Sequence, residues 1–350
     1  MTVDASLLPA APARLPTAAA RRRVFGLGLA LGLLALALLV LGVAVGSTGI
    51  DSLAAMRDDP VAWRIVWDIR LPRTAGAWVT GALLGLAGAV AQGLFRNPLA
   101  DPYLLGSGSG ASLGAALALL AAGRPAGADW WLQIGITGAA FVGAVVAVVL
   151  TLGLARGAHH TLRLLLGGVI VGVVLGAAKD LVTVAAPGIL ESMHGFTLGT
   201  TSFLGWQAVT MMTAVLLACV VAAWWLAPVL DGLTLGEATA ASLSLALPGL
   251  RAALVAVLAL ATATAVAQAG MIAFVGLAAP HLVRPLVRST HAPLLLLSAA
   301  MVGALLMVAD LLARWLLAPQ ELPVGVLTAL IGGGYLLWLM HRRGLSGGSR

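Results

Sequence analysis

The stretch VFGLGLALGLLALALLVLGVAVG, residues 24 to 46, contains no charged or hydrogen-bonding side chain. A helix of about 20 apolar residues crosses the ~30 Å hydrocarbon core of a bilayer, and a run of this length is typical of such a helix. It is too long for the core of a cleaved signal peptide. Arg21, Arg22 and Arg23 stand directly before it, and positive side chains mark the cytoplasmic end of a span. The stretch therefore predicts a first membrane-spanning helix with a cytoplasmic N-terminus.

The composition of the whole chain agrees with this assignment. Of its 350 residues 61% are hydrophobic and only 9% are charged, with a mean hydropathy of +1.04, which excludes an ordinary soluble globular protein. The net charge of +7 comes without a basic run interleaved with aromatic residues, so we expect no nucleic-acid partner. A single cysteine, Cys219, allows neither an intrachain disulfide nor a cysteine metal cluster.

Most of the remaining sequence divides into similar apolar runs, separated by charged, Pro-rich or Gly-rich breaks. We expect an all-α, polytopic membrane protein of about ten transmembrane helices, with both termini on one side. The predicted spans lie near residues 24–46, 74–94, 103–122, 132–155, 164–186, 207–227, 251–269, 271–287, 292–312 and 324–340.

The arginines support an orientation with both termini in the cytoplasm. Thirteen fall on the inner side, at positions 14, 21, 22, 23, 96, 156, 163, 251, 284, 288, 342, 343 and 350, and six on the outer side, at 57, 64, 70, 73, 124 and 314. Four of those six lie between residues 57 and 73. Such a local excess of outer positive charge suggests a docking surface for an acidic partner.

The chain divides into a membrane domain and two short tails. We expect residues 1–23 to form a disordered cytoplasmic tail, residues 24–341 the transmembrane domain, and residues 342–350 a C-terminal cytoplasmic tail. Residues 231–250 form the longest polar break on the cytoplasmic side. A short amphipathic helix within this break could contact a soluble partner.

Motifs for enzyme chemistry and metal binding are missing from the sequence. It has no P-loop with its Gly-Lys-Ser/Thr, so we do not expect this chain to hydrolyse ATP. The run from Gly106 to Gly110 follows no strand and contains no lysine, which favours close helix packing over phosphate binding. His159 and His160 are adjacent and would point apart on a helix, a poor geometry for metal ligands.

Small residues recur at helical spacing within two predicted spans, at Gly81, Gly85 and Gly88 and at Gly168, Gly172 and Gly176. In lipid, such small faces let two helix backbones approach closely and gain packing contacts. We expect most of these glycines to serve helix packing.

Two pairs of opposite charges lie close to the outer ends of predicted spans. Lys179 and Asp180 form either an interfacial pair or a contact for an anionic substrate, because ionisable groups inside spans usually face partners or a substrate path. Asp310 and Arg314 are four residues apart and can pair on one face of a helix.

Several separated motifs then occur in one order. They are Arg70-Leu-Pro-Arg73, Gly81-Ala-Leu-Leu-Gly85, Asn97-Pro-Leu-Ala-Asp-Pro102, Leu105-Gly106, Leu164-Leu-Leu-Gly-Gly168, Leu235-Gly-Glu237, Phe274-Val-Gly-Leu277 with Pro280-His281, Asp310 with Arg314, and Glu321-Leu-Pro-Val-Gly325. In this order and spacing the chain resembles the FecCD family, the permease subunits of bacterial importers for iron siderophores, haem and cobalamin. The resemblance covers about residues 24 to 341.

The resemblance implies a ten-helix subunit, similar to the cobalamin permease, that pairs with a second copy of itself around a central pathway. It also implies two cytoplasmic ATPase subunits, which bind ATP and magnesium, and a periplasmic substrate-binding protein. This chain itself is then expected to be a permease subunit without enzyme activity, resident cofactor or metal.

The resemblance also implies roles for individual residues. Arginines matching Arg70, Arg73 and Arg314 dock the binding protein in the family. His160 and Thr161 fall at the position of the cytoplasmic gate, before the fifth span.

The segment that matches the family's ATPase coupling region begins with Leu235, Gly236 and Glu237. The sequence departs from the family pattern at Ala241 and near Ser244, so the fit to the ATPase is expected to differ in detail. Import of an iron chelate, a siderophore or haem, is the function that the resemblance implies. Cobalamin import is the alternative, and a secondary transporter driven by an ion gradient is a more distant one, since that class usually has midplane carboxylates.

Overall fold

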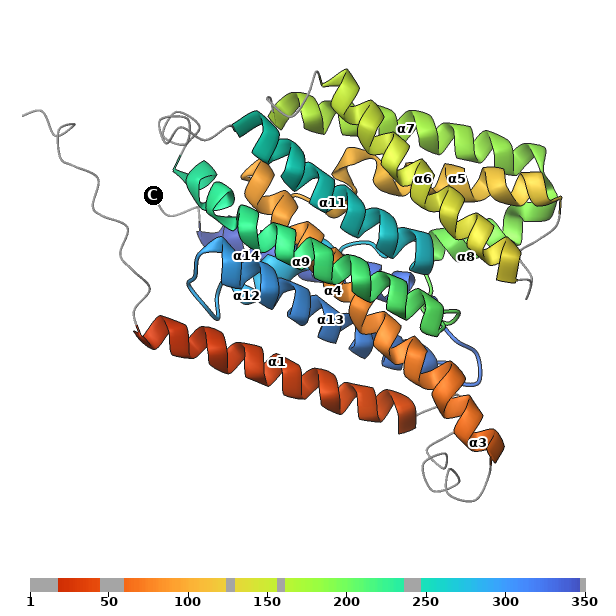
Figure 1. Cartoon of the computed structure of the whole chain (residues 1–350), viewed down its shortest axis with the longest axis horizontal. Coiled ribbons are helices and arrows are strands. Elements are labelled where there is room, and N and C mark those ends of the chain that lie inside the picture. The colour runs from red at the N-terminus through yellow and green to blue at the C-terminus, as the bar shows by residue number, and fades with distance from the viewer. Residues whose placement is uncertain (1–17, 45–59, 124–129, 156–160, 236–246, 347–350) are drawn as a thin grey trace, which may run out of the picture.

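Helices form every regular element in the part of the chain that the structure describes, residues 18–44, 60–123, 130–155, 161–235 and 247–346. The structure is a computed structural model, drawn in Figure 1. Its elements in order are α1 (Ala18–Ala44), α3 (Pro60–Arg64), the π-helical η2 (Ile65–Arg70), α4 (Leu71–Phe95), the 3-10 helix η3 (Pro102–Leu105), α5 (Ser107–Ala122), α6 (Trp130–Leu154), α7 (Thr161–Ala185), the 3-10 helix η4 (Pro187–Ile189), α8 (Leu190–Leu198), α9 (Trp206–Thr234), α11 (Leu247–Ala269), α12 (Val275–Val283), α13 (His291–Trp315) and α14 (Val324–Ser346). The predicted all-α class is confirmed.

Seven of the described helices are long and apolar enough to cross a membrane. They are α1, the continuous helix Pro60–Phe95, α6, α7, α9, α11 and α13. Helices α5 and α14 have shorter apolar stretches, and α12 has nine residues, about 14 Å of helix, less than half of the hydrocarbon core. A helix occurs at each of the ten predicted positions, but ten membrane-spanning helices are not confirmed.

Helix α4 forms the centre of the molecule. Figure 1 shows it crossing the middle of the bundle, and α9, α11, α12 and α13 pack around it. Nearly all residues between Pro72 and Phe95 are buried. Apolar residues occur on every side of α4, as expected for a helix in the core of a bundle.

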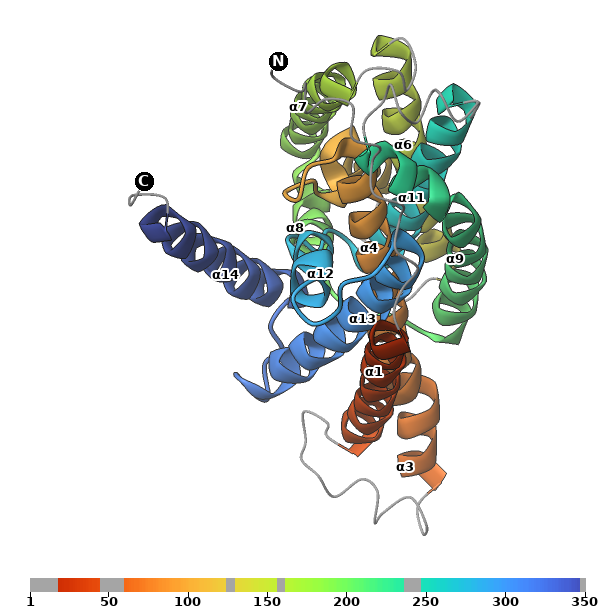
Figure 2. The same cartoon turned by 90° about the vertical axis from the view of Figure 1, so that its left-hand side faces the viewer.

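The peripheral helices leave wide apolar faces uncovered. Helices α1 and α7 bury only a small part of their length, and α14 projects away from the other helices in Figure 2. Leu330, Ile331 and Leu337 of α14 are exposed, as are Val173 and Val174 of α7. In a membrane protein such faces contact lipid or another protein.

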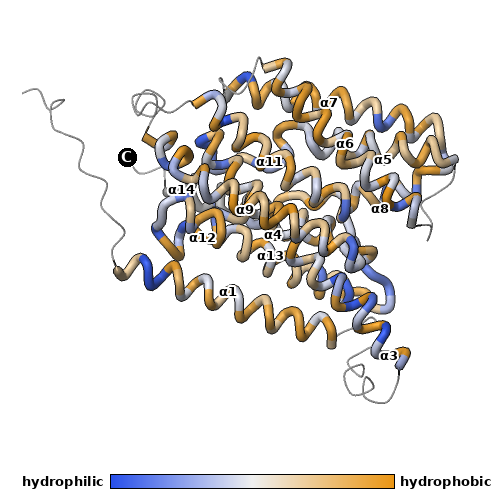
Figure 3. Tube along the Cα trace, viewed as in Figure 1, coloured by the Kyte–Doolittle hydropathy of each residue, from blue (hydrophilic) through white to orange (hydrophobic). Residues whose placement is uncertain are grey.

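The distribution of polar residues fits a membrane orientation. Figure 3 shows hydrophobic residues along most of the helices and hydrophilic residues gathered near α3 and at the start of α1. Helix α1 begins at Ala18, so Arg21, Arg22 and Arg23 lie in its first two turns rather than before it. The predicted boundary between tail and membrane domain thus lies six residues inside a helix.

Close packing at glycine is confirmed for four of the six predicted positions. A Cβ atom on Gly81 would lie 2.5 Å from the carbonyl oxygen of Val302, and one on Gly85 would lie 2.6 Å from that of Ser298. Gly88 abuts the carbonyl of Gly276 and Gly168 that of Leu104. The other two, Gly172 and Gly176, approach only Ser109 and Gly106 at ordinary contact distance.

Candidate functional site

Two non-helical segments interrupt the helical bundle. The first follows α4 and runs from Arg96 to Gly106 around the short η3, and the second, Gly270 to Phe274, separates α11 from α12. Pro98 and Pro102 lie in the first segment, and Gly106 ends it in the left-handed conformation with a φ of 77°. Proline lacks the amide hydrogen that a helix needs, which explains why the helix stops there.

Both interruptions lie level with the middle of α4. A Cβ atom on Gly276 would lie 2.8 Å from the carbonyl oxygen of Leu84 and 2.9 Å from Cδ of Pro102. Leu84 is thirteen residues after the start of α4, about 20 Å along the helix. Non-helical backbone at such depth is tolerated only inside protein or beside a cavity, so these segments identify a candidate transport site.

One tyrosine joins the two interruptions. The Tyr103 hydroxyl lies 3.3 Å from the carbonyl oxygen of Ile272, to which it donates, and 3.4 Å from the Ile272 amide nitrogen, from which it accepts. The carboxylate of Asp101 accepts from the Tyr103 amide at 2.8 Å and so caps η3. Side chains therefore supply hydrogen bonds that the broken helices cannot provide for themselves.

A hollow of about 400 Å³ lies beside this junction, between η3, the start of α5 and α7. Its wall combines a few polar side chains, among them Asp101, Tyr103 and Ser109, with apolar groups and glycines. Val169 and Val173 border the hollow and are exposed, so it opens on the uncovered face of α7. Such a wall suits a large solute that needs few directed contacts.

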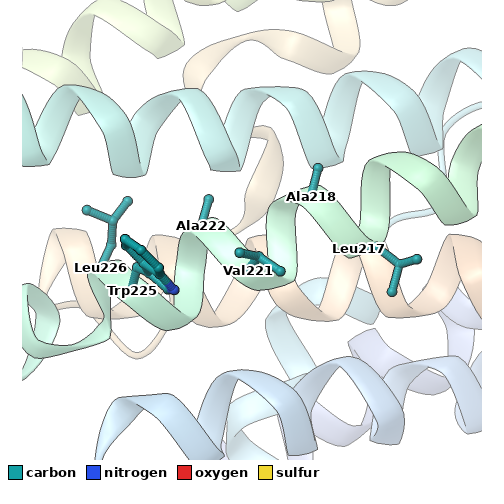
Figure 4. A pocket seen from close by; sticks show the side chains of 6 residues that line it. All are labelled: Leu217, Ala218, Val221, Ala222, Trp225 and Leu226. Atoms are coloured by element: carbon teal, nitrogen blue, oxygen red, sulfur yellow. The ribbon is translucent and has the colours of Figure 1, made fainter.

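Another hollow lies on the outward face of α9 and is of a different kind. Its six lining residues, shown in Figure 4, are Leu217, Ala218, Val221, Ala222, Trp225 and Leu226. All belong to one helix, five of them are aliphatic, and the sixth, Trp225, is largely exposed. The indole N–H of Trp225 is the single side-chain hydrogen-bonding group among these lining residues, so we assign this hollow to the lipid-facing surface.

An ion-pair cluster, which we call the outer cluster, ties together Arg73, Asp310, Arg314 and Glu321. Arg73 Nε lies 3.1 Å from Oδ1 of Asp310, and Arg73 Nη1 lies 2.8 Å from Oε2 of Glu321. Arg314 pairs with the other oxygen of Asp310. Two cations thus balance two carboxylates, and every carboxylate oxygen of Asp310 has a cationic partner.

Further hydrogen bonds fasten neighbouring segments to the outer cluster. Arg314 donates to the carbonyl oxygen of Gly42 in α1 at 3.1 Å and to the Thr74 hydroxyl at 3.2 Å. The Thr201 hydroxyl donates to Asp310 at 2.6 Å, and the Ser202 hydroxyl to Glu321 at 3.0 Å. The cluster therefore connects α1, α4, α13 and the segment before α9.

The structure places the three predicted docking arginines together at this end of the bundle. The predicted pairing of Asp310 with Arg314 is confirmed, but Arg314 is only 3% exposed and Arg73 is also buried. Arg70 is partly buried and donates to the carbonyl oxygens of Val43 and Ala44 at 3.2 and 3.4 Å. Docking by these residues stays a prediction.

The Lys179 and Asp180 side chains contact each other near the C-terminal end of α7, the end predicted to face outward. Lys179 Nζ lies 2.5 Å from Oδ1 of Asp180, whose side chain is 69% exposed. The pair is on the same helix as the wall of the hollow, but neither residue lines it. Both interpretations from the sequence, an interfacial pair and a substrate contact, remain predictions.

At the opposite end of the bundle, a contact between Asp231 and His291 was not foreseen from the sequence. Asp231 Oδ1 lies 3.0 Å from the His291 amide and 2.6 Å from its Nδ1. Leu235 follows Asp231 by four residues and is exposed at the end of α9. A polar side chain just before the Leu235-Gly-Glu237 motif was the available signal.

Most other residues predicted at this inner end fall outside the described ranges. Gly236, Glu237, Ala241, Ser244 and His160 are among them. Thr161 is the first residue of α7, at the helix end where the resemblance puts the gate.

Metal chemistry has no support in the described ranges. They contain no group of three or more His, Cys, Asp or Glu residues close enough to hold an ion. Cys219 is a free, buried thiol within α9.

A bundle of apolar helices, with two interrupted segments beside a hollow that a few polar side chains line, is typical of a membrane transport permease. The sequence matches the FecCD transport family over residues 29–342, and the chain belongs to this family of ABC importer permeases.

Relatives support the assignment over nearly the whole chain. The haemin transport system permease protein HmuU of Yersinia pestis is 36% identical over 327 residues, which cover 90% of this chain and 96% of HmuU. The vitamin B12 import permease BtuC of Salmonella paratyphi A is 38% identical over 278 residues, covering 79% of this chain and 83% of BtuC.

Solved structures share the fold. One, described as an inward-facing conformation of a metal-chelate type ABC transporter, superposes with a TM-score of 0.81 at 28% identity and covers 92% of this chain and 99% of that chain. PsaBC of Streptococcus pneumoniae matches with a TM-score of 0.57 at 16% identity, covering 82% of this chain and 93% of that one, which shows likeness of fold alone.

Proposed function

We propose that this chain forms the transmembrane pathway of an ATP-driven importer that moves an iron chelate, a siderophore or haem, from the periplasm to the cytoplasm. The hollow between η3, α5 and α7 is the observation that carries the proposal, because it combines polar and apolar walls at the depth of the broken helices. Family membership replaces the ion-gradient alternative with the ABC mechanism.

A second copy of the chain is the partner that completes this pathway. The hollow is bordered by an exposed face of α7, and α14 projects from the body with exposed leucines and an isoleucine. Pairing of two copies through these faces would cover them and enclose the hollow. Since lipid is as apolar as these side chains, the gain comes from packing and from closing the polar wall.

Further partners act at the two ends of the subunit. The outer end, with Arg70, Arg73 and Arg314, receives a periplasmic binding protein. In the free subunit Arg73 and Arg314 hold the outer cluster together, so Arg70 is the residue best placed for direct charge contact. We assign Lys179 and Asp180, near the outer end of α7, to the substrate path.

At the inner end, the segment that begins with Leu235, Gly236 and Glu237 and includes Ala241 and Ser244 seats in two cytoplasmic ATPase subunits. These subunits bind ATP and magnesium. His160 and Thr161 belong to the cytoplasmic gate. Both termini are cytoplasmic and the protein resides in the inner membrane, in agreement with the arginines at the start of α1.

Iron chelates and cobalamin differ in what an uptake experiment would show. The permease, reconstituted in vesicles with its ATPase and its binding protein, is offered haemin, a ferric hydroxamate or cyanocobalamin, with ATP inside. We expect uptake of haemin or the hydroxamate. Uptake of cyanocobalamin alone would establish the cobalamin alternative, and ATP-independent uptake would contradict the importer.

The predicted coupling segment provides a second test. Glu237→Arg should abolish transport while the complex still assembles, because a positive charge would replace the acidic group at the ATPase contact. ATP hydrolysis by the permease alone would refute the assignment of hydrolysis to a separate subunit.

A further inference from the structure

Helices α4 and α13 run antiparallel and touch at four levels in one register. Arg73 meets Asp310, and Gly81 meets Val302. Further along, Gly85 meets Ser298 and Gly93 meets His291. From one contact to the next, the residue number rises by 8, 4 and 8 along α4 and falls by 8, 4 and 7 along α13.

The register extends across the whole membrane. Twenty residues separate Arg73 from Gly93, which is about 30 Å of helix and equals the thickness of the hydrocarbon core. One end of the pair therefore lies at the outer cluster and the other end at the cytoplasmic side.

Close backbone contacts prevent the two helices from sliding past each other. Cβ atoms on Gly81 and Gly85 would lie within 2.6 Å of carbonyl oxygens of α13, so a slip of one residue would drive larger side chains into that backbone. Packed helices of this kind have few alternative arrangements and move as one body.

Each end of the α4 and α13 pair contacts a segment outside these two helices. At the outer end, Arg73 holds Glu321 and Asp310 holds Thr201. At the inner end, the His291 ring lies against α4, where a Cβ atom on Gly93 would be 3.2 Å from its Nε2. The same residue binds Asp231 through its amide and its ring, and Asp231 is four residues before Leu235.

We propose that α4 and α13 move as one rigid unit, the rod, which transmits the docking of the binding protein at the outer cluster to the ATPase contact. Asp231 and His291 form the joint that connects this rod to α9. The inference rests on the proposed function and adds to it the route of communication. Asp231 and His291 are positioning residues here, since they set the place of the inner end of α9, from which the predicted coupling segment continues.

The experiment compares hydrolysis with and without the binding protein in the complete reconstituted complex. Asp231→Ala removes the carboxylate oxygen that contacts both the amide and the ring of His291. The stimulation of ATP hydrolysis by the binding protein should therefore fall about tenfold, a loss within the range of typical allosteric coupling. Basal hydrolysis and the affinity for the binding protein should stay at the wild-type level. Asp231→Asn keeps an acceptor for the amide and should lose less.

A control and two opposing outcomes make the test decisive. Thr210→Ala on the same α9 removes a local hydrogen bond to Gln207 and should leave stimulation unchanged. Wild-type stimulation in Asp231→Ala, or an equal fall in basal hydrolysis, affinity and stimulation, would overturn the rod and leave the importer intact. Absence of stimulation in the wild-type complex would instead overturn the proposed function and the rod with it.

Discussion

The Tyr103 hydroxyl and the Ile272 backbone, 169 residues apart in sequence, form a two-way hydrogen bond between the two broken segments of the bundle. The hydroxyl donates to the carbonyl oxygen and accepts from the amide of the same residue. Unpaired backbone groups are costly where water is excluded, so this contact stabilises a non-helical crossing at membrane depth.

Tyr103→Phe should destabilise the protein because it removes both bonds while keeping the ring. We expect a loss of about 1–3 kcal/mol, the cost of leaving buried polar groups unpaired, measured by unfolding in detergent. Ser109→Ala, which changes another residue of the same hollow, is the control and should have little effect. Equal stability of Tyr103→Phe and wild type would show that water replaces the hydroxyl.

Gly85→Ala should disturb the contact between α4 and α13. The added methyl group would lie 2.6 Å from the carbonyl oxygen of Ser298, and overpacking of this kind costs about 1–3 kcal/mol. Gly135→Ala in α6 is the matched control, because no atom of a neighbouring helix lies within 4 Å of its Cβ position. Since alanine favours helix more than glycine does, the control should not lose stability. A stable Gly85→Ala protein would contradict the rigid packing.

Asp310→Asn should weaken the outer cluster. It leaves Arg73 and Arg314 close together without the buried carboxylate between them, and breaking a buried ion pair costs about 3–5 kcal/mol. The free energy of unfolding tests this, with the exposed Asp68→Asn as the control. If both variants unfold alike, the cluster contributes no stability.

Arg70→Gln should slow association of the binding protein and reduce the dependence of its rate on salt. Glutamine keeps a side-chain donor but is shorter and uncharged, so the change removes the charge together with the contacts to Val43 and Ala44. Charges at the rim of an interface act chiefly on encounter, and salt screens them. Arg163→Gln, on the inner side, should leave association unchanged. An unaltered rate at low salt for Arg70→Gln would contradict docking at this end.

Lys179→Met tests the substrate path. If Lys179 meets an anionic chelate, uptake by the reconstituted complex should require more substrate for half-maximal rate, while assembly and basal ATP hydrolysis persist. Asp180→Asn frees the ammonium group from its 2.5 Å contact and should have the opposite effect on the half-maximal concentration. Unchanged uptake in both variants would assign the pair to the membrane interface.

The sequence by itself determined the class of protein, the approximate positions of most helices and the family. An apolar run such as residues 24–46 shows that its transfer from water into lipid is favourable, and this free energy depends on the segment alone. Pairing of Asp310 with Arg314 was also predictable, because the spacing of four residues sets it within one helix.

The broken crossing could not be read in the same way. Gly270 to Phe274 is as apolar as the helices around it, so hydropathy predicted one span over residues 271–287, where the structure has a non-helical segment and the short α12. Hydropathy measures the free energy of transferring side chains from water into lipid. It does not show whether the backbone is helical.

Only the tertiary structure decided which distant residues meet. Arg73 pairs with Asp310 and Glu321, and Asp231 with His291, across sequence separations of 60 to 248 residues. In a soluble protein the buried face of a helix differs from its wet face, but lipid and protein interior are equally apolar, so a membrane helix carries little signal of which neighbour it packs against. The rod of α4 and α13, the hollow beside Tyr103 and the joint at Asp231 follow from that packing.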